Sequence, residues 1–266
     1  MHVSNTPRTL LIAAHPDDET IGAAVRISRS REVEIVHVTD GAPANPSDAL
    51  AAGFSSARDY AAARRKETEC ALAKAGVLPS SIQNLGFMDQ QLSFRLEELT
   101  ARLVTLFDEL QPHVVLTHSY EGGHPDHDSV AFACSLAKEL HERSNPAWSF
   151  DLVEFTGYHA ADGGIRTYEF LPNVVETAPS SPLSAPEREL KVSMLREFKS
   201  QARTLAPFMD PEFELFRKAP AYDFSQPPHA GTLFYEHFDW GVNGREWRNL
   251  ASDALAGLLN PITDRS

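Results

Sequence analysis

The sequence predicts an α/β fold, a Rossmann-like three-layer sandwich in which a mostly parallel sheet carries helices on both faces. Short apolar runs typical of buried strands alternate with longer segments of helical periodicity through the first half of the chain. Polar clusters directly follow four of the expected strands, at the sheet edge where ligands bind in this fold class. With 266 residues, the chain is long enough to bury a sizeable core.

The first half is expected to alternate between strands and helices. The segment 42–54 is rich in Ala, Pro, Gly, Asn and Ser and is expected to be a loop. Gly76 suits the end of the helix that precedes it. The expected strands are residues 9–14, 33–38, 82–85 and 113–117. The expected helices are residues 21–28, 58–75, 96–110 and 129–142.

The second half is less regular. Alternating apolar residues predict strands at 150–158 and 167–175, and a loop at 180–186 precedes a helix expected at 187–205. Farther on, the chain is rich in proline and aromatic residues, which is typical of an irregular wall around a site. We therefore expect a single domain over 1–266, with a core of about 8–205 and a C-terminal extension, 206–266, that walls the site.

The charge balance restricts the partners. Lys and Arg number 24 against 37 Asp and Glu, so the formal net charge is −13, which disfavours binding to nucleic acid. Cys70 and Cys134 have no CxxC neighbours, so a disulfide framework is not expected. The N-terminus has no signal-peptide pattern and no apolar run approaches membrane-spanning length. We expect a cytoplasmic protein without membrane insertion, and a homo-oligomer stays open.

Two short motifs carry the chemistry. HPDDE, residues 15–19, follows the first expected strand, and HPDHD, residues 124–128, follows the strand at 113–117. Acidic residues are favoured in a first helical turn, which explains the carboxylates of HPDDE but not His15. Neutral histidine and carboxylate are suitable Zn²⁺ ligands, and His124 and His127 are spaced to lie on one side of a helix start. No GxGxxG follows the first strand, so no dinucleotide cofactor is expected.

The pair of motifs resembles the PIG-L/LmbE family of zinc-dependent N-deacetylases. That family carries AHPDDE after its first strand and HPDH after a later one, and this sequence has both in the same order. Softer matches are TDGA at 39–42, RRKE at 64–67, LGFMD at 85–89 and KSQ at 199–201. The resemblance covers roughly residues 8 to 201. It implies an LmbE-like fold and an enzyme that removes an acetyl group from an N-acetylglucosamine-type sugar or glycoconjugate and releases acetate.

The resemblance also implies roles for individual residues. It places Zn²⁺ on three protein ligands with an open position for water, although Fe²⁺ or another divalent ion suits the same donors. It implies a general base beside the ligands, a histidine that stabilises the oxyanion, and an aspartate that orients this histidine. The implied metal ligands are His15, Asp18 and His127; the base is Asp17; the oxyanion histidine is His124 and its partner is Asp126; Arg64 and Asp89 contact the substrate.

One position departs from the family pattern. Some members carry a tyrosine two residues before the first histidine of HPDH, where this chain has Gly122. Tyr120 is two residues farther upstream and is not assigned a catalytic role. Late aromatic residues are candidates to stack on a sugar or to pack in the core: Tyr235, Phe238 and Trp240. Two alternatives stay open: hydrolysis of another amide, such as a thiol-sugar conjugate or an antibiotic precursor, and a non-catalytic binding protein.

Overall fold

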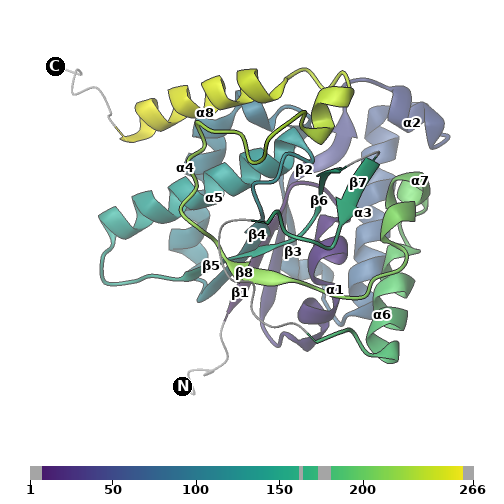
Figure 1. Cartoon of the computed structure of the whole chain (residues 1–266). Helices are drawn as coiled ribbons and strands as arrows, with labels where there is room; N and C mark the ends of the chain where they lie inside the picture. The colour runs from purple at the N-terminus through teal and green to yellow at the C-terminus, as the bar shows by residue number, and fades with distance from the viewer. Residues whose placement is uncertain (1–7, 162–163, 173–180, 260–266) are drawn as a thin grey trace, which may run out of the picture.

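The computed structural model describes residues 8–161, 164–172 and 181–259. Within these residues, six strands form a sheet in the order β3-β2-β1-β4-β5-β8 (Figure 1). All neighbours in this sheet are parallel except β5 and β8, which are antiparallel. The strands of the sheet are β1 (Thr9–Ala13), β2 (Val33–Pro43), β3 (Ile82–Asp89), β4 (Val114–His118), β5 (Asp151–Phe155) and β8 (Phe216–Lys218). The predicted α/β class and mostly parallel sheet are confirmed.

Helices cover both faces of the sheet and create two hydrophobic cores. One core packs against α4, α5 and α8, and the other packs against α1, α3 and α6 (Figure 1). The helices are α1 (Asp18–Arg29), α2 (Ser47–Ala51), α3 (Ala57–Lys74), α4 (Leu96–Leu110), α5 (Pro125–Ser144), α6 (Ala185–Leu195), α7 (Ala202–Leu205) and α8 (Gly244–Leu259). Short 3-10 turns are η1 (Pro79–Ser81), η2 (Leu92–Phe94), η3 (Lys199–Gln201), η4 (Ala206–Phe208) and η5 (Phe234–His237).

The two histidine motifs meet because of the strand order. β1 pairs with β2 on one side and with β4 on the other, so the chain leaves these two neighbouring strands toward opposite faces of the sheet. Such a point opens a crevice at the carboxyl ends of the strands. HPDDE follows β1 and HPDHD follows β4, and the crevice brings together His15 and His127, which are 112 residues apart in the chain.

Several expected boundaries were wrong in the second half. The expected helix at 187–205 is broken into α6, η3 and α7, and the strand expected at 167–175 is absent over 168–172, while 173–175 lies outside the described residues. The segment beyond Pro207 is not irregular throughout, because it contributes the edge strand β8 and the helix α8. A hairpin of β6 (Tyr158–Ala161) and β7 (Gly164–Thr167) continues beyond β5.

Two smaller corrections concern the first half. The expected loop at 42–54 contains the short helix α2, and β3 continues to Asp89, beyond the strand expected at 82–85. No helix among residues 8–161, 164–172 and 181–259 combines the length and the apolar character needed to cross a lipid bilayer.

A buried ion pair supports a break in α1. Ala23 departs from helical geometry, with φ −147° and ψ 20°, so backbone groups on both sides of it need other partners. The carboxylate of Glu214 accepts the N–H groups of Val25 at 2.9 Å and Arg26 at 3.1 Å. Lys191 Nζ lies 3.0 Å from the same carboxylate and also donates to the carbonyl of Ile21. Both charged side chains are buried, so the break in the helix depends on this pair.

Candidate active site

The HPDDE segment turns sharply between β1 and α1. Asp18 begins α1, and its Oδ2 accepts the backbone N–H of His15 at 2.7 Å. Asp17, just before the helix, has φ 126°, a backbone conformation that residues other than glycine rarely adopt. Its backbone N–H donates to Glu19 Oε2 at 3.0 Å, and that oxygen lies 2.9 Å from His37 Nε2. These contacts hold a strained backbone, as is common at functional sites.

The HPDHD segment starts α5 four residues earlier than expected. Pro125 occupies the first helical turn, where its missing N–H costs no hydrogen bond, and His124 caps the helix. His124 Nδ1 accepts the backbone N–H of Asp126 at 3.1 Å. The carboxylate of Asp126 accepts the backbone N–H groups of Gln90 at 2.6 Å and Leu92 at 3.1 Å. The backbone of Asp126, and not its carboxylate, therefore orients His124.

The side chains of His15, Asp18 and His127 meet in a compact triangle, to which Asp18 contributes both carboxylate oxygens. His15 Nδ1 lies 3.2 Å from Asp18 Oδ2, His127 Nε2 lies 3.1 Å from Asp18 Oδ1, and the two histidine nitrogens are 3.3 Å apart. Ligand atoms bound at 2.0–2.1 Å to a tetrahedral zinc ion are about 3.3 Å from one another. All three residues are buried; His15 and His127 form one candidate metal group with His124, and Asp18 and His127 form another with His118. The donor types and their spacing therefore fit a divalent cation.

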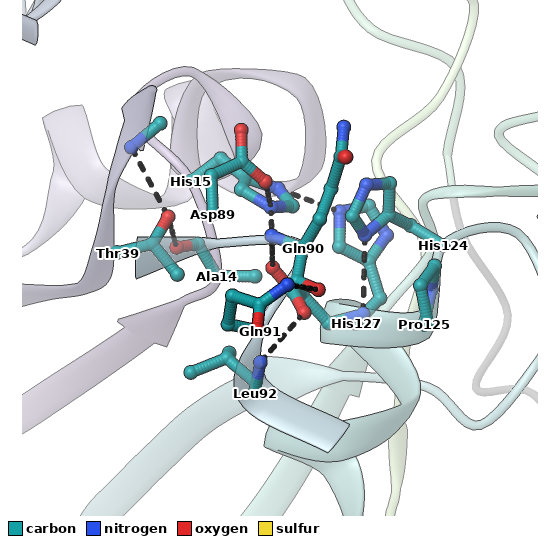
Figure 2. Close-up of polar contacts among 12 residues, drawn as sticks. Ala14, His15, Thr39, Asp89, Gln90, Gln91, Leu92, His124, Pro125 and His127 are labelled. Atoms are coloured by element: carbon teal, nitrogen blue, oxygen red, sulfur yellow. Dashed lines mark hydrogen bonds and ion pairs between the residues drawn. The ribbon is translucent and has the colours of Figure 1, made fainter. Parts of the chain in front are cut away.

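The far nitrogen of His15 is held by two carboxylates. His15 Nε2 lies 3.0 Å from Asp89 Oδ1 and 3.3 Å from Asp126 Oδ2, and Figure 2 shows Asp89 and His15 beside the rings of His124 and His127. A carboxylate at one ring nitrogen of a histidine fixes its proton there and leaves the other nitrogen free to bind metal. Asp89 and Asp126 thus favour the tautomer in which His15 Nδ1 is a ligand.

The site has an excess of negative charge. Burial raises the pKa of Asp17 to about 8, although Arg64 opposes this effect. Burial also acts to raise the pKa of Asp18, but His127, His118 and His15 together hold that pKa well below its usual range. Because several carboxylates face few cations, the cluster favours uptake of a cation. Its buried carboxylates and guanidinium are Asp17, Asp18, Asp89, Asp126 and Arg64.

Arg64 is engaged by the protein. Its guanidinium donates to Asp17 Oδ2 at 2.9 Å and to the carbonyl of Pro16 at 2.7 Å, and it also contacts the carbonyl of Gly41. Gly41 has φ 69°, and a Cβ atom there would lie 2.4 Å from the guanidinium, so a glycine is required for this approach. The structure therefore places Arg64 as a clamp on Asp17 at the floor of the pocket.

His118, at the end of β4, joins the cluster although the motifs do not include it. Its ring stacks on His127 at 4.1 Å, and its Nε2 accepts the backbone N–H of Ala14 at 3.0 Å. Burial and the neighbouring His127 lower the pKa of His118 to about 4, so the ring is neutral. The sequence signal for His118 is its place at the end of a strand next to β1.

The triangle opens into a pocket of about 530 Å³. Trp240 lines it with its ring 4.5 Å from that of His124, and Phe238 stacks on Trp240 at 4.5 Å. Tyr235 is buried and does not line the pocket. Of the three late aromatic residues, Phe238 and Trp240 therefore face the pocket, whereas Tyr235 belongs to the interior.

Two tyrosines near the motifs have different positions. The hydroxyl of Tyr120 donates to the carbonyl of Gln226 at 2.9 Å, and its ring stacks on Trp247, away from the pocket lining. Tyr158 lines the pocket, with its ring 5.5 Å from that of His127. The motifs do not identify Tyr158, and the only signal in the sequence is its place at the end of an expected strand.

The comparison with protein families agrees with the motifs. The family model of PIG-L, GlcNAc-PI de-N-acetylase, matches residues 10–138. Residues 10–138 form a PIG-L family domain. The matched segment contains both histidine motifs and Arg64, and it ends within α5. The resemblance expected from the motifs is therefore confirmed.

A curated relative is similar to this chain over a longer segment than the family model. It is the 1D-myo-inositol 2-acetamido-2-deoxy-alpha-D-glucopyranoside deacetylase of Mycolicibacterium gilvum (strain PYR-GCK), 33% identical over 188 residues. The match covers 61% of this chain and 62% of the relative. Among the curated relatives that it matches, the chain spans between 48% and 62% of their length.

Solved structures share the fold of this chain. A triple mutant of a deacetylase from the teicoplanin biosynthetic pathway has a TM-score of 0.59 at 19% identity, over 81% of this chain and 99% of that chain. The 4-carboxy-2-hydroxymuconate hydratase of Pseudomonas putida KT2440 has a TM-score of 0.52 at 17% identity, over 76% and 82%. Since one fold serves a deacetylase and a hydratase, the reaction has to be argued from the site.

Proposed function

We propose that this protein is a zinc-dependent hydrolase that removes the acetyl group from an N-acetylglucosamine-type sugar and releases acetate. The observation that carries the proposal is the triangle of His15, Asp18 and His127. The two histidine nitrogens lie 3.3 Å apart and each lies 3.1–3.2 Å from an oxygen of Asp18, spacings that suit one tetrahedral ion. These three residues are the proposed ligands. A bound zinc ion supplies an activated water and polarises the acetyl carbonyl.

Asp17 is the proposed general base. It is next in the chain to the ligand Asp18, and Arg64 holds its carboxylate at 2.9 Å. Burial keeps the pKa of Asp17 near 8, and a cation bound at Asp18 would act to lower it. With a pKa in this range, the carboxylate of Asp17 can accept a proton near neutral pH.

His124 is the proposed donor to the oxyanion. Burial, together with His15 and His127, lowers the pKa of His124 well below its usual range, so the imidazole is neutral. Its Nδ1 accepts a backbone N–H, which leaves the ring proton on Nε2. The ring lines the pocket, so Nε2–H is available to hydrogen-bond the oxygen of the attacked carbonyl.

The aromatic wall supports a sugar substrate. Trp240 and Phe238 present stacked rings beside His124, and flat apolar faces of this kind suit the apolar face of a pyranose ring. The named relatives deacetylate an N-acetylglucosamine unit linked to inositol, which is consistent with a substrate of this class. We further propose a cytoplasmic location and a single domain in which the late segment walls the site.

The function is tested by measuring acetate release from a panel of substrates. The panel contains N-acetylglucosamine, its disaccharide, an inositol glycoside of N-acetylglucosamine and an N-acylated thiol sugar, each with and without a chelator. Acetate from an N-acetyl sugar that stops with chelator and returns with Zn²⁺ supports the proposal. Cleavage of only the thiol conjugate would favour the alternative amidase, and a metal-free protein that cleaves nothing would favour a binding protein.

His127→Ala is expected to remove the metal. The variant loses one of three ligands, so the metal content measured by elemental analysis after dialysis should fall from near stoichiometric to background, together with activity. His237→Ala is the matched control, because His237 is an exposed histidine outside the pocket lining. Full metal content in His127→Ala would contradict the ligand assignment.

A further inference from the structure

The six tyrosine hydroxyls of the chain have different surroundings. Four of them have a hydrogen-bond partner within the described residues: Tyr60 with Gln201, Tyr120 with Gln226, Tyr168 with Phe208 and Tyr222 with Glu154. The hydroxyl of Tyr235 is closed off in the interior. Tyr158 differs from all five, because it lines the active-site pocket and no described residue accepts or donates a hydrogen bond at its hydroxyl.

The ring of Tyr158 is held on three sides. It makes edge-to-face contacts with His127 at 5.5 Å, Phe234 at 5.5 Å and Phe208 at 6.0 Å. The backbone is held as well, since a Cβ atom on Gly123 would lie 2.0 Å from the Tyr158 carbonyl oxygen. Because these contacts fix the ring, its hydroxyl points in a single direction. That direction is set by the loop that carries His124 and His127.

The hydroxyl of Tyr158 is available as a hydrogen-bond donor. A phenol ordinarily titrates at about pH 10, so it keeps its proton at neutral pH. Tyr158 lines the same pocket as His15, Asp18 and His127, and its ring contacts that of His127. It therefore faces the same space as the triangle.

We propose that Tyr158 is a catalytic residue whose hydroxyl donates a hydrogen bond to the oxygen of the acyl carbonyl as that oxygen gains negative charge. This inference rests on the proposed function. No covalent bond forms to Tyr158 and no proton leaves it; the hydrogen bond strengthens as the carbonyl carbon becomes tetrahedral. Tyr158 lies beyond residues 10–138, the segment that matches the family model, so its role comes from the hairpin after β5.

Tyr158→Phe in the metal-loaded protein tests the proposal. Removal of one donor to an oxyanion lowers kcat by about 10²–10³-fold, so we expect a loss of this size with KM changed by less than about threefold. Tyr120→Phe is the matched control, since its hydroxyl donates to the carbonyl of Gln226 and neither residue lines the pocket. Metal content and the melting temperature (Tm) of Tyr158→Phe should equal those of the wild type.

A binding measurement separates catalysis from substrate recognition. Calorimetry compares a phosphonamidate analogue, which resembles the tetrahedral intermediate, with the deacetylated amine product. We expect Tyr158→Phe to weaken the analogue by about 10²-fold and the product by less than about threefold. Equal weakening of both ligands, or a higher KM at unchanged kcat, would overturn the catalytic role. Wild-type protein that releases no acetate overturns the proposed function, whereas an active Tyr158→Phe overturns only this inference.

Discussion

Asp17→Asn is expected to lower kcat by about 10²–10⁴-fold, the contribution of a positioned general base. Asparagine has nearly the same shape and keeps an oxygen that can accept the hydrogen bond from Arg64, which is 2.9 Å long in the native protein. It cannot accept a proton from water, so turnover should fall while the ligands His15, Asp18 and His127 are unchanged. The measurement is steady-state acetate release at saturating substrate, with metal content determined on the same sample.

A second pocket carboxylate provides the control for Asp17. Asp48 of α2 also lines the pocket but is exposed, so Asp48→Asn removes the same charge without affecting the cluster. Its kcat should stay within about threefold of the wild type, since an exposed charge is screened by water and contributes little. If Asp17→Asn retained wild-type kcat with metal bound, another group would have to be the base. If it lost the metal, Asp17 would be part of the metal site.

Glu214→Gln is expected to lower the free energy of unfolding by about 3–5 kcal/mol, because it leaves the buried Lys191 without its counter-charge. Lys191 lies 3.0 Å from Glu214 in the interior between α1 and α6, and both side chains are buried. Glutamine also replaces a carboxylate that bonds two N–H groups of α1, at Val25 and Arg26, with a single oxygen acceptor. The break in α1 then loses part of its support, and the start of this helix carries Asp18.

Urea denaturation of matched variants measures this effect. Glu212→Gln is the control, since Glu212 is an exposed glutamate on the same segment and should change stability by less than about 0.5 kcal/mol. Lys191→Met combined with Glu214→Gln removes both charges and should recover part of the loss, because an apolar pair avoids an unpaired buried charge. A double variant less stable than Glu214→Gln would mean that Lys191 acts through its contact with Ile21 and not through charge.

The two histidine motifs were predictable because they are local. His15 and Asp18 lie within one turn of chain between a strand and a helix, and His124 and His127 begin another helix, so short-range spacing defines each motif. The α/β class was predictable for a related reason: apolar runs and helical periodicity are properties of consecutive residues. Predictions became poorer beyond residue 142, where short elements depend on contacts with distant parts of the chain.

The contacts of individual side chains were less predictable. Arg64 was expected to contact the substrate; it lines the pocket, and its guanidinium also bonds Asp17 and two backbone carbonyls. Asp126 was expected to orient His124; it contacts His124 through its backbone N–H, whereas its carboxylate bonds the loop after β3 and lies beside His15. These partners come from elements far apart in the sequence, so residue type and spacing carry no information about which of them a side chain meets.

The sequence by itself determined the fold class and the two motifs that supply the proposed ligands and base, because local patterns encode both. Only the tertiary structure decided how these groups act together. The placement of β1 beside β4 brings His15 within 3.3 Å of His127, and the hairpin after β5 adds Tyr158 to the pocket. The physical reason is that the proposed metal site, base and oxyanion donor each depend on distances between side chains from different elements, and those distances exist only once the sheet and its two helical layers have packed.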